Sequence, residues 1–212
     1  MLLQFQSFLA NKNTNFLSKI SYQYYSKNNP LTFKNNSIPF ISQRDILDSN
    51  NEKYAEKILF NSIGNKFAVA IGYNPAINSS TSIDKSNFLI SNLLYNQNYS
   101  GYYLFNIFPD VSVLKINKNN SSYPNYIEDV LDFLFAQTII TNLDLIIFWG
   151  SSAYVNKNIE KKLKTLNTKF STYTIGTNAI IHKHPGRNVC INTIKLNTNN
   201  LSSLTKKCRY LK

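Results

Sequence analysis

The chain contains few of the residue types on which compact metal, redox and disulfide sites depend. It has two cysteines, Cys190 and Cys208, and two histidines among 212 residues. Two cysteines exclude a disulfide framework and a cysteine-only metal or iron–sulfur site, and they favour a reduced, cytoplasmic protein. No run of about 18 apolar residues is present, so no membrane-spanning helix is expected. The first residues also lack the basic start that is typical of a signal peptide.

Acidic residues are scarce as well. The chain has 23 Lys and Arg against 11 Asp and Glu, which gives a formal net charge of +12. Charge of this sign favours a polyanion or an anionic membrane surface as the partner. Asparagine recurs throughout with Lys, Ile, Tyr and Phe, a bias that is typical of an AT-rich genome and carries no functional weight. The sequence identifies no protein partner.

The length suits one sizeable core with an extension. Residues 1–50 are the least regular part, and we expect an N-terminal extension there, either an appended layer or a mobile arm, rather than a separate domain. Residues 51–212 are predicted to form a single α/β domain.

Strands and helices alternate after this point. An edge strand is predicted at Tyr54–Phe60, and helices near residues 87–95, 126–138 and 155–166. Four buried strands are predicted between and after them, at Phe67–Ile71, Tyr102–Phe105, Leu143–Phe148 and Thr172–Ile175. This alternation predicts a three-layer α/β/α fold with a mostly parallel, four-stranded central sheet.

A short polar or glycine-containing motif follows each of these buried strands. The motifs are Gly72-Tyr73-Asn74-Pro75, Asn106, Trp149-Gly150-Ser151-Ser152 and His182-Lys183-His184-Pro185. In an open α/β sheet, ligands bind at the carboxyl edge of the parallel strands. The order of the motifs therefore predicts a binding site at this edge.

Two interpretations are possible for each of the two asparagines in these motifs, Asn74 and Asn106. Asn74 is either part of an ordinary Asn-Pro turn or an amide that holds a water or a base edge. Asn106 ends a buried strand, so it needs a hydrogen-bond partner. That partner is either backbone in a turn or a ligand in the cleft.

The later motifs are basic or lie at a helix start. Ser151 or Ser152 suits an N-cap, and the N–H groups there are able to bind a phosphate. His182 and His184 lie on opposite faces of an extended segment with no Cys or carboxylate nearby, so no metal site is expected, and no cofactor is predicted. Lys183, His184 and Arg187 make this loop basic.

Together the motifs resemble those of the uracil-DNA glycosylase superfamily. Ile71-Gly72-Tyr73-Asn74-Pro75 is similar to its Gly-Ile-Asn-Pro motif, Ile147–Ala153 to its Leu-Trp-Gly-x-x-Ala motif, and His184-Pro185 to the start of its His-Pro-Ser-Pro-Leu motif. With Asp84–Asn87 and Asn106–Pro109 added, the pattern also resembles an uncharacterised bacterial domain family. The resemblance covers about residues 52–190.

The resemblance implies the fold of that superfamily and a role for several residues. Asn74 would hold the attacking water, Asn106 would bind the base edge, and His184 would stabilise the departing base. Phe88 would stack on the base. The base is first extruded from the stack, because its sugar carbon is out of reach inside a duplex.

Three departures from the superfamily pattern stand out. Ala76 replaces a tyrosine that excludes bulky pyrimidines, which suggests a roomier pocket. Arg187 follows His184-Pro185 where the superfamily has an apolar wedge, so Arg187 fills the gap in the duplex or nothing does. Asp84 is either a second water-activating group or a carboxylate at a helix N-terminus.

Three functions fit these observations. The first is a DNA glycosylase acting on a damaged or modified base, in repair, in phage defence or as a phage-encoded enzyme. The second is an inactive nucleic-acid or nucleotide binding module with the same fold. The third is a hydrolase of free nucleotides or nucleosides. The net charge favours a polymer such as DNA over a small substrate.

Overall fold

A computed structural model describes residues 1–12, 21–25, 31–49, 51–75, 81–111, 123, 125–137, 143–149, 157–176 and 195–198. The helices are α1 (Leu2–Lys12), α2 (Lys85–Asn96), α3 (Tyr126–Ala136) and α4 (Lys157–Leu166). The strands are β1 (Ser21–Tyr25), β2 (Thr32–Phe33), β3 (Asn36–Ser37), β4 (Ile41–Ser49), β5 (Glu52–Phe60), β6 (Lys66–Gly72), β7 (Tyr99–Asn106), β8 (Leu143–Ile147), β9 (Ser171–Gly176) and β10 (Lys195–Thr198).

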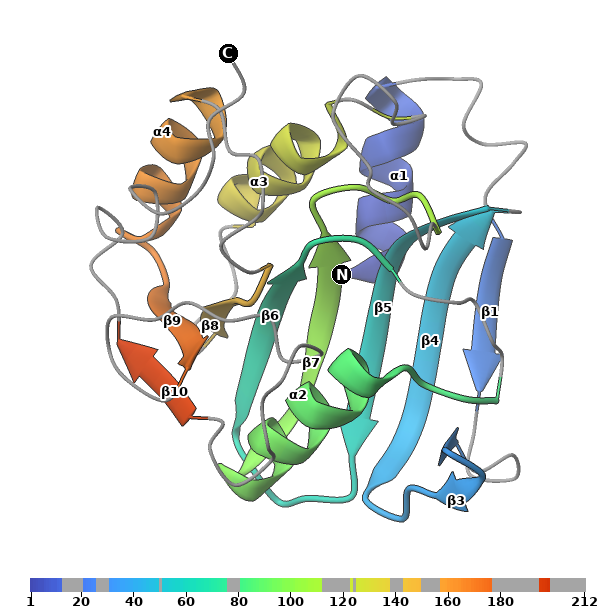
Figure 1. Ribbon diagram of the computed structural model, residues 1–212. Coiled ribbons are helices and arrows are strands. Elements are labelled where there is room, and N and C mark those ends of the chain that lie inside the picture. Colours follow the sequence, from blue (N-terminus) through green and yellow to red (C-terminus); the bar gives the residue numbers. More distant parts are fainter. Residues whose placement is uncertain are drawn as a thin grey trace.

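Eight of these strands form one mixed sheet, in the order β1-β4-β5-β7-β6-β8-β9-β10 (Figure 1). The neighbours β7, β6, β8 and β9 run parallel to one another. Antiparallel strands extend this parallel block on both sides, with β5, β4 and β1 on one side and β10 on the other. The predicted α/β class is confirmed. The four predicted buried strands form the parallel block, but the sheet as a whole has eight strands and is not mostly parallel, because four of its seven strand pairings are antiparallel.

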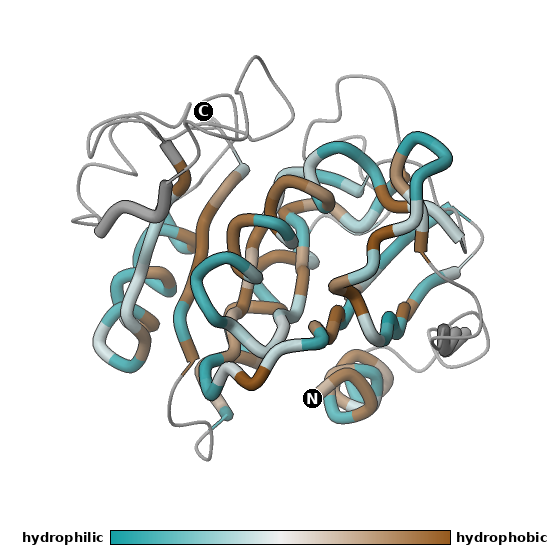
Figure 2. The backbone as a smooth tube through the Cα atoms, turned by 90° about the horizontal axis from the view of Figure 1, so that it is seen from below, coloured by the Kyte–Doolittle hydropathy of each residue, from teal (hydrophilic) through white to brown (hydrophobic). Residues whose placement is uncertain are grey.

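Helices cover both faces of the sheet. Helix α2 packs on one face, while α1, α3 and α4 pack on the other. Strand β6 explains the arrangement, because Ala68 and Ala70 belong to the core under α2 and Val69 and Ile71 to the core on the opposite side. A strand covered on both faces has to be apolar at successive positions. Figure 2 shows that the hydrophobic stretches gather in the strands and the inner helix surfaces.

The N-terminal part contributes to the same core and sheet. Phe5 and Leu9 of α1 are fully buried in the larger apolar cluster. Strand β4 lies between β1 and β5, so the prediction that residues 54–60 form an edge strand is wrong. The sequence pattern did not reveal β4, because Arg44, Asp45 and Asp48 interrupt its apolar residues and are nevertheless buried.

Three of the four described helices lie within about two residues of their predicted ranges, and α1 was not predicted. Asp84 caps α2, and α3 carries Glu128 and Asp129 in its first turn, where a carboxylate is favoured by the helix dipole. In α4, Ile159 and Leu163 are buried and the lysines lie outward. None of the four described helices is long and apolar enough to cross a membrane.

Candidate functional site at the carboxyl edge

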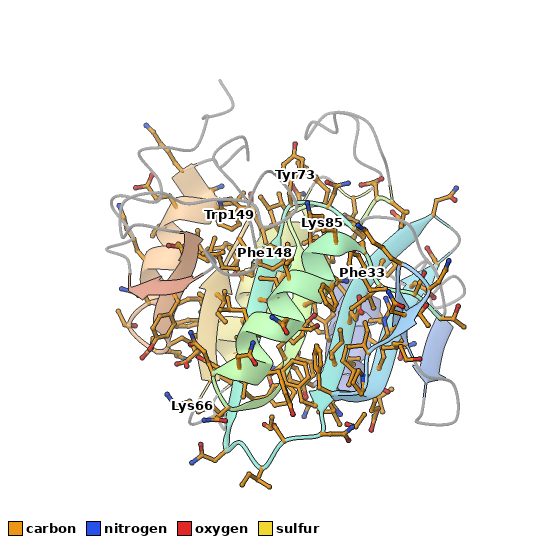
Figure 3. All side chains as sticks on the ribbon, turned by 60° about the horizontal axis from the view of Figure 1, so that its bottom comes forward. Phe33, Lys66, Tyr73, Lys85, Phe148 and Trp149 are labelled. Atoms are coloured by element: carbon orange, nitrogen blue, oxygen red, sulfur yellow. The ribbon has the colours of Figure 1, made fainter. Side chains whose placement is uncertain are left out.

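Three of the polar motifs meet at the carboxyl edge of the parallel block. The sheet register places Gly72 beside Asn106, and Ile71 beside Ile147. Backbone hydrogen bonds continue past the strand ends, from Ile107 N to Gly72 O at 3.0 Å and from Phe148 N to Ile71 O at 2.9 Å. The ends of β6, β7 and β8 are therefore fixed relative to one another, and Figure 3 shows Tyr73, Phe148 and Trp149 together at this end of the sheet.

Gly72 provides the space that the Asn106 side chain occupies. A Cβ on Gly72 would lie 2.6 Å from Asn106 Oδ1 and 3.0 Å from the Phe148 ring. A methyl group there would force the Asn106 side chain or the Phe148 ring to move, so glycine leaves the space that the amide occupies. Asn106 is 4% exposed. The glycine thus lets a buried amide lie against the end of the neighbouring strand, at the expected ligand edge.

The turn after β6 is held by its own contacts. Asn74 is half-buried, and its Nδ2 donates a hydrogen bond to the Pro75 carbonyl oxygen at 3.3 Å. The Tyr73 ring packs edge-to-face on Phe108, with ring centroids 5.6 Å apart, and Phe108 N donates to Tyr73 O at 3.1 Å. The turn that carries Asn74 therefore sits next to the segment that follows Asn106.

Trp149 belongs to the apolar core. It is 1% exposed and lies in the large apolar cluster with the residues of α3 and α4. Its ring fills the space between the end of β8 and the helical layer. Trp149 therefore closes the core beneath the carboxyl edge.

Asp84 is the N-cap of α2. Its Oδ1 accepts a hydrogen bond from Asn87 N at 3.0 Å. Of the two readings given by the sequence, the helix N-terminal carboxylate is thus observed. The water-activating role stays a prediction.

Phe88 is already stacked on another ring. Phe33, from the short hairpin formed by β2 and β3, lies parallel to Phe88, with centroids 4.4 Å apart and an interplanar angle of 9°. Both rings are half-buried. One face of Phe88 is therefore covered by Phe33, and stacking on a base would use the opposite face or require the hairpin to move.

A buried ionic cluster lies under the N-terminus of α2. Glu56 of β5 accepts hydrogen bonds from Arg44 Nε at 2.5 Å, from Lys53 Nζ at 2.8 Å and from Asn87 Nδ2 at 3.3 Å. All four side chains are at most 3% exposed. Arg44 Nη1 also donates to the carbonyl oxygen of Ser82 at 3.2 Å. The cluster therefore fixes both the segment before α2 and its first turn on the sheet.

The cluster holds Glu56 ionised. Burial alone would raise the pKa of Glu56, but the charges of Arg44 and Lys53 and their hydrogen bonds outweigh burial and lower the pKa to about 2. Glu56 pairs with Leu104 across the β5–β7 ladder, two residues before Asn106. The ionised cluster and the buried amide are thus close neighbours on one face of the sheet.

The sequence analysis did not identify Arg44, Lys53, Glu56 or Asn87 as site residues. The available signal was Glu56, a charged residue within the predicted strand Tyr54–Phe60. A charge in a buried strand is rarely unpaired. Lys53 lies on the same strand, but Arg44 comes from a strand that the pattern missed and Asn87 from the helix start, so the cluster could not be assembled from the sequence.

The remaining predicted site residues lie outside the described part of the chain. They are Ala76, Ser151, Ser152, Lys183, His184 and Arg187. Their proposed roles stay predictions. Within the ranges that the structure describes, no three His, Cys, Asp or Glu side chains come together as a metal site.

Comparison of the chain with known proteins finds one matching family. No curated protein matches the chain. Residues 56–186 match the family described as "Protein of unknown function (DUF1643)". The matched segment begins at Glu56 of the ionic cluster and includes Asn74, Asp84 and Asn106. Because the match covers more than half of the chain, this protein belongs to the DUF1643 family.

Proposed function

We propose that this protein is a DNA glycosylase-like enzyme that hydrolyses the N-glycosidic bond of a damaged or modified base flipped out of DNA. The observation that carries the proposal is the Asn106 amide, buried at the carboxyl edge in a space that Gly72 leaves open. An amide in such a place offers both a donor and an acceptor to the edge of a base. Buried polar groups discriminate strongly, because a ligand that lacks the matching group leaves them unpaired.

Each proposed role is the one that the resemblance to the glycosylase superfamily implies. Asn106 binds the base edge, and Asn74, on the adjoining turn, holds the water that attacks the sugar carbon. As the bond breaks, negative charge develops on the base, and His184 is assigned to stabilise it. Donors that meet charge only as it forms contribute to rate more than to binding. Asp84 serves as the helix cap, and the proposal does not require it to activate water.

The charge of the chain supports a polymeric substrate. A net charge of +12 attracts the phosphate backbone, whereas a free nucleoside carries no phosphate to be attracted. Lys and Arg that neutralise phosphates release counterions, so binding should weaken steeply with salt. The resemblance to the glycosylase superfamily described above points in the same direction.

An excision assay tests the proposal directly. The full chain is incubated with oligonucleotides carrying uracil, mismatches or modified bases, and abasic sites are then revealed by alkaline cleavage. We expect cleavage of at least one member of the panel. His184→Ala should slow that reaction by on the order of a hundredfold with nearly unchanged DNA affinity. DNA binding without excision of any base would contradict the enzymatic proposal.

A second function, a nucleic-acid binding module without catalysis, is favoured by two specific contacts. Phe88 is stacked on Phe33, and the Asp84 carboxylate is engaged as a helix cap. Two of the residues proposed for the site therefore already have structural partners. Salt-dependent DNA binding by the wild type, together with a His184→Ala variant that behaves identically in every assay, would select this function.

A further inference from the structure

The β2–β3 hairpin forms a surface that the proposed active site does not use. Its two strands pair with each other and lie outside the main sheet. Leu31 and Ile38, at its base, are buried with Ile83 in a small apolar cluster. Thr32 N donates to Thr81 O at 2.9 Å, and Ile83 N donates to Thr32 O at 3.0 Å. The hairpin is thus fixed to the segment that leads into the cap of α2.

The tip of the hairpin presents a lysine to solvent. Lys34 and Asn35 have left-handed backbone conformations, with φ angles of 50° and 65°, as a tight hairpin turn requires. Both side chains are exposed. Lys34 Nζ lies 5.6 Å from the centre of the Phe33 ring. The charge therefore stands next to an aromatic surface.

Four side chains form a row in which two aromatic rings lie between two lysines. Lys34 stands over Phe33, Phe33 stacks on Phe88, and the exposed Lys85 lies one helical turn before Phe88 on the same side of α2. Figure 3 shows Phe33 and Lys85 at the start of α2. We call these four residues the aromatic row. Two cations flank two rings that both remain partly exposed.

The charge around the row selects a polyanion. Residues 31–43 contain no Asp or Glu, so the hairpin adds only positive charge. Aromatic rings next to lysines are the combination with which proteins bind single-stranded nucleic acid, because any base is able to stack on a ring while lysine contacts its phosphate. Bases inside a duplex are already stacked on each other and offer no free face.

We propose that the aromatic row binds single-stranded nucleic acid on the face of the sheet that α2 covers. Figure 1 shows the β2–β3 hairpin toward the amino ends of the parallel strands. The row is connected to the ionic cluster, since Asn87, the neighbour of Phe88, donates to Glu56. This inference rests on the proposed function for its partner, and it adds the strand preference and the surface. It does not depend on catalysis.

Binding of the full chain to labelled oligonucleotides tests the inference. Fluorescence anisotropy is measured with a thymidine single strand and with the matching thymidine–adenine duplex. Phe33→Leu keeps an apolar side chain on the small cluster but removes the ring, and Phe33→Tyr keeps the ring. We expect tighter binding of the single strand, on the order of tenfold weaker binding by Phe33→Leu, and near wild-type binding by Phe33→Tyr. Thermal unfolding confirms that both variants are folded.

Two lysine variants provide a test that does not touch packing. Lys34→Ala should lower the slope of log affinity against log salt concentration by about 0.7, the value for one phosphate contact on a single strand. Lys66 is also exposed, but it begins β6 and lies away from Phe33 and Lys85 (Figure 3). Lys66→Ala should leave the slope unchanged.

Several results would overturn the inference. They are equal affinity for duplex and single strand, wild-type binding by a folded Phe33→Leu variant, and competition by polyglutamate, which has charge but no bases, as effective as competition by the oligonucleotide. If the single strand binds but these variants bind it as tightly as the wild type, the aromatic row is not the binding surface, and the proposed function is unaffected. If no nucleic acid binds at all, both are wrong.

Discussion

The two edges of the parallel block differ in where their polar groups lie. At the carboxyl edge, Asn106 and Glu56 are buried and held between neighbouring side chains. At the amino edge, Ile63 is fully exposed and a shallow cavity of about 410 Å³ opens to solvent. The cavity is lined by Asn61, Ser62, Ile63, Tyr95, Asn96 and Asn98.

The difference teaches that the two edges are distinguished by the burial of their polar groups. The asparagines around the amino-edge cavity are exposed, and Asn61 Nδ2 donates to the Pro39 carbonyl oxygen at 2.8 Å. At the carboxyl edge the polar groups have lost water, so a ligand that matches them gains more and a ligand that does not match them loses more. The burial of its polar groups therefore makes the carboxyl edge the candidate site.

The largest effect is expected from removing the charge at the centre of the ionic cluster. Glu56→Gln keeps the volume of the side chain but removes the negative charge that Arg44 and Lys53 contact in the core. Breaking a buried pair in this way costs about 3–5 kcal/mol of unfolding free energy. Equilibrium unfolding in urea measures the loss. A loss below about 1 kcal/mol, the value of an exposed ion pair, would show that the cluster is not structurally important.

A smaller effect is expected where Gly72 meets Asn106. Gly72→Ala places a methyl group 2.6 Å from Asn106 Oδ1 and should cost about 1–3 kcal/mol through overpacking. In an Asn106→Ala background the same change should cost about 1 kcal/mol less, because one of the two clashing groups is gone. A double-mutant cycle in urea gives this coupling energy. Zero coupling would mean that the two residues do not share the space.

Lowering the pH should remove the contribution of Glu56 to the free energy of unfolding. The pKa of Glu56 in the folded protein is about 2, below its ordinary value of 4.5. Glu56 therefore contributes stability that is fully present above pH 4.5 and is lost as the pH falls through 2. The stability gap between wild type and Glu56→Gln should narrow over this range, which urea unfolding at several pH values measures. All other carboxylates cancel in the comparison. A gap that stays constant down to pH 2 would contradict the assignment.

The smallest effect is expected at the amino edge. Ile63→Ala changes a side chain that is fully exposed, so its unfolding free energy should stay within about 0.5 kcal/mol of the wild type. Its affinity for oligonucleotides should not change either. A clear loss of binding by this variant, measured by anisotropy, would move the interface to the amino edge.

Parts of the fold follow from local sequence patterns. The run Phe67–Ile71 is apolar at every position, which requires cover on both faces, and β6 is indeed central. A helix was predicted near residues 126–138, and α3 is observed at Tyr126–Ala136, with buried residues at helical spacing and Glu128 and Asp129 in its first turn. These elements were predictable because burial and helix chemistry act over a few neighbouring residues.

Other parts depend on partners distant in the sequence. Strand β4 carries the buried charged residues Arg44 and Asp45, and its sequence alone is typical of an exposed segment. Their burial is explained by the ion pairs that they form with Glu56 and Lys57 of β5. The stack of Phe33 on Phe88 joins residues 55 positions apart (88 − 33). The convergence of Gly72 and Asn106 was predictable, since both end parallel strands. The contact of the Asn106 amide with the glycine was not, because it depends on side-chain direction.

The most direct test of the account compares two asparagines at the two edges. Abasic-site formation on the modified-base panel is measured for the wild type, for Asn106→Ala and for Asn96→Ala, whose exposed side chain lines the amino-edge cavity. The account predicts excision by the wild type, on the order of a hundredfold less by Asn106→Ala, and wild-type excision by Asn96→Ala. Excision that survives loss of Asn106 but fails with loss of Asn96 would contradict it, as would no excision by the wild type.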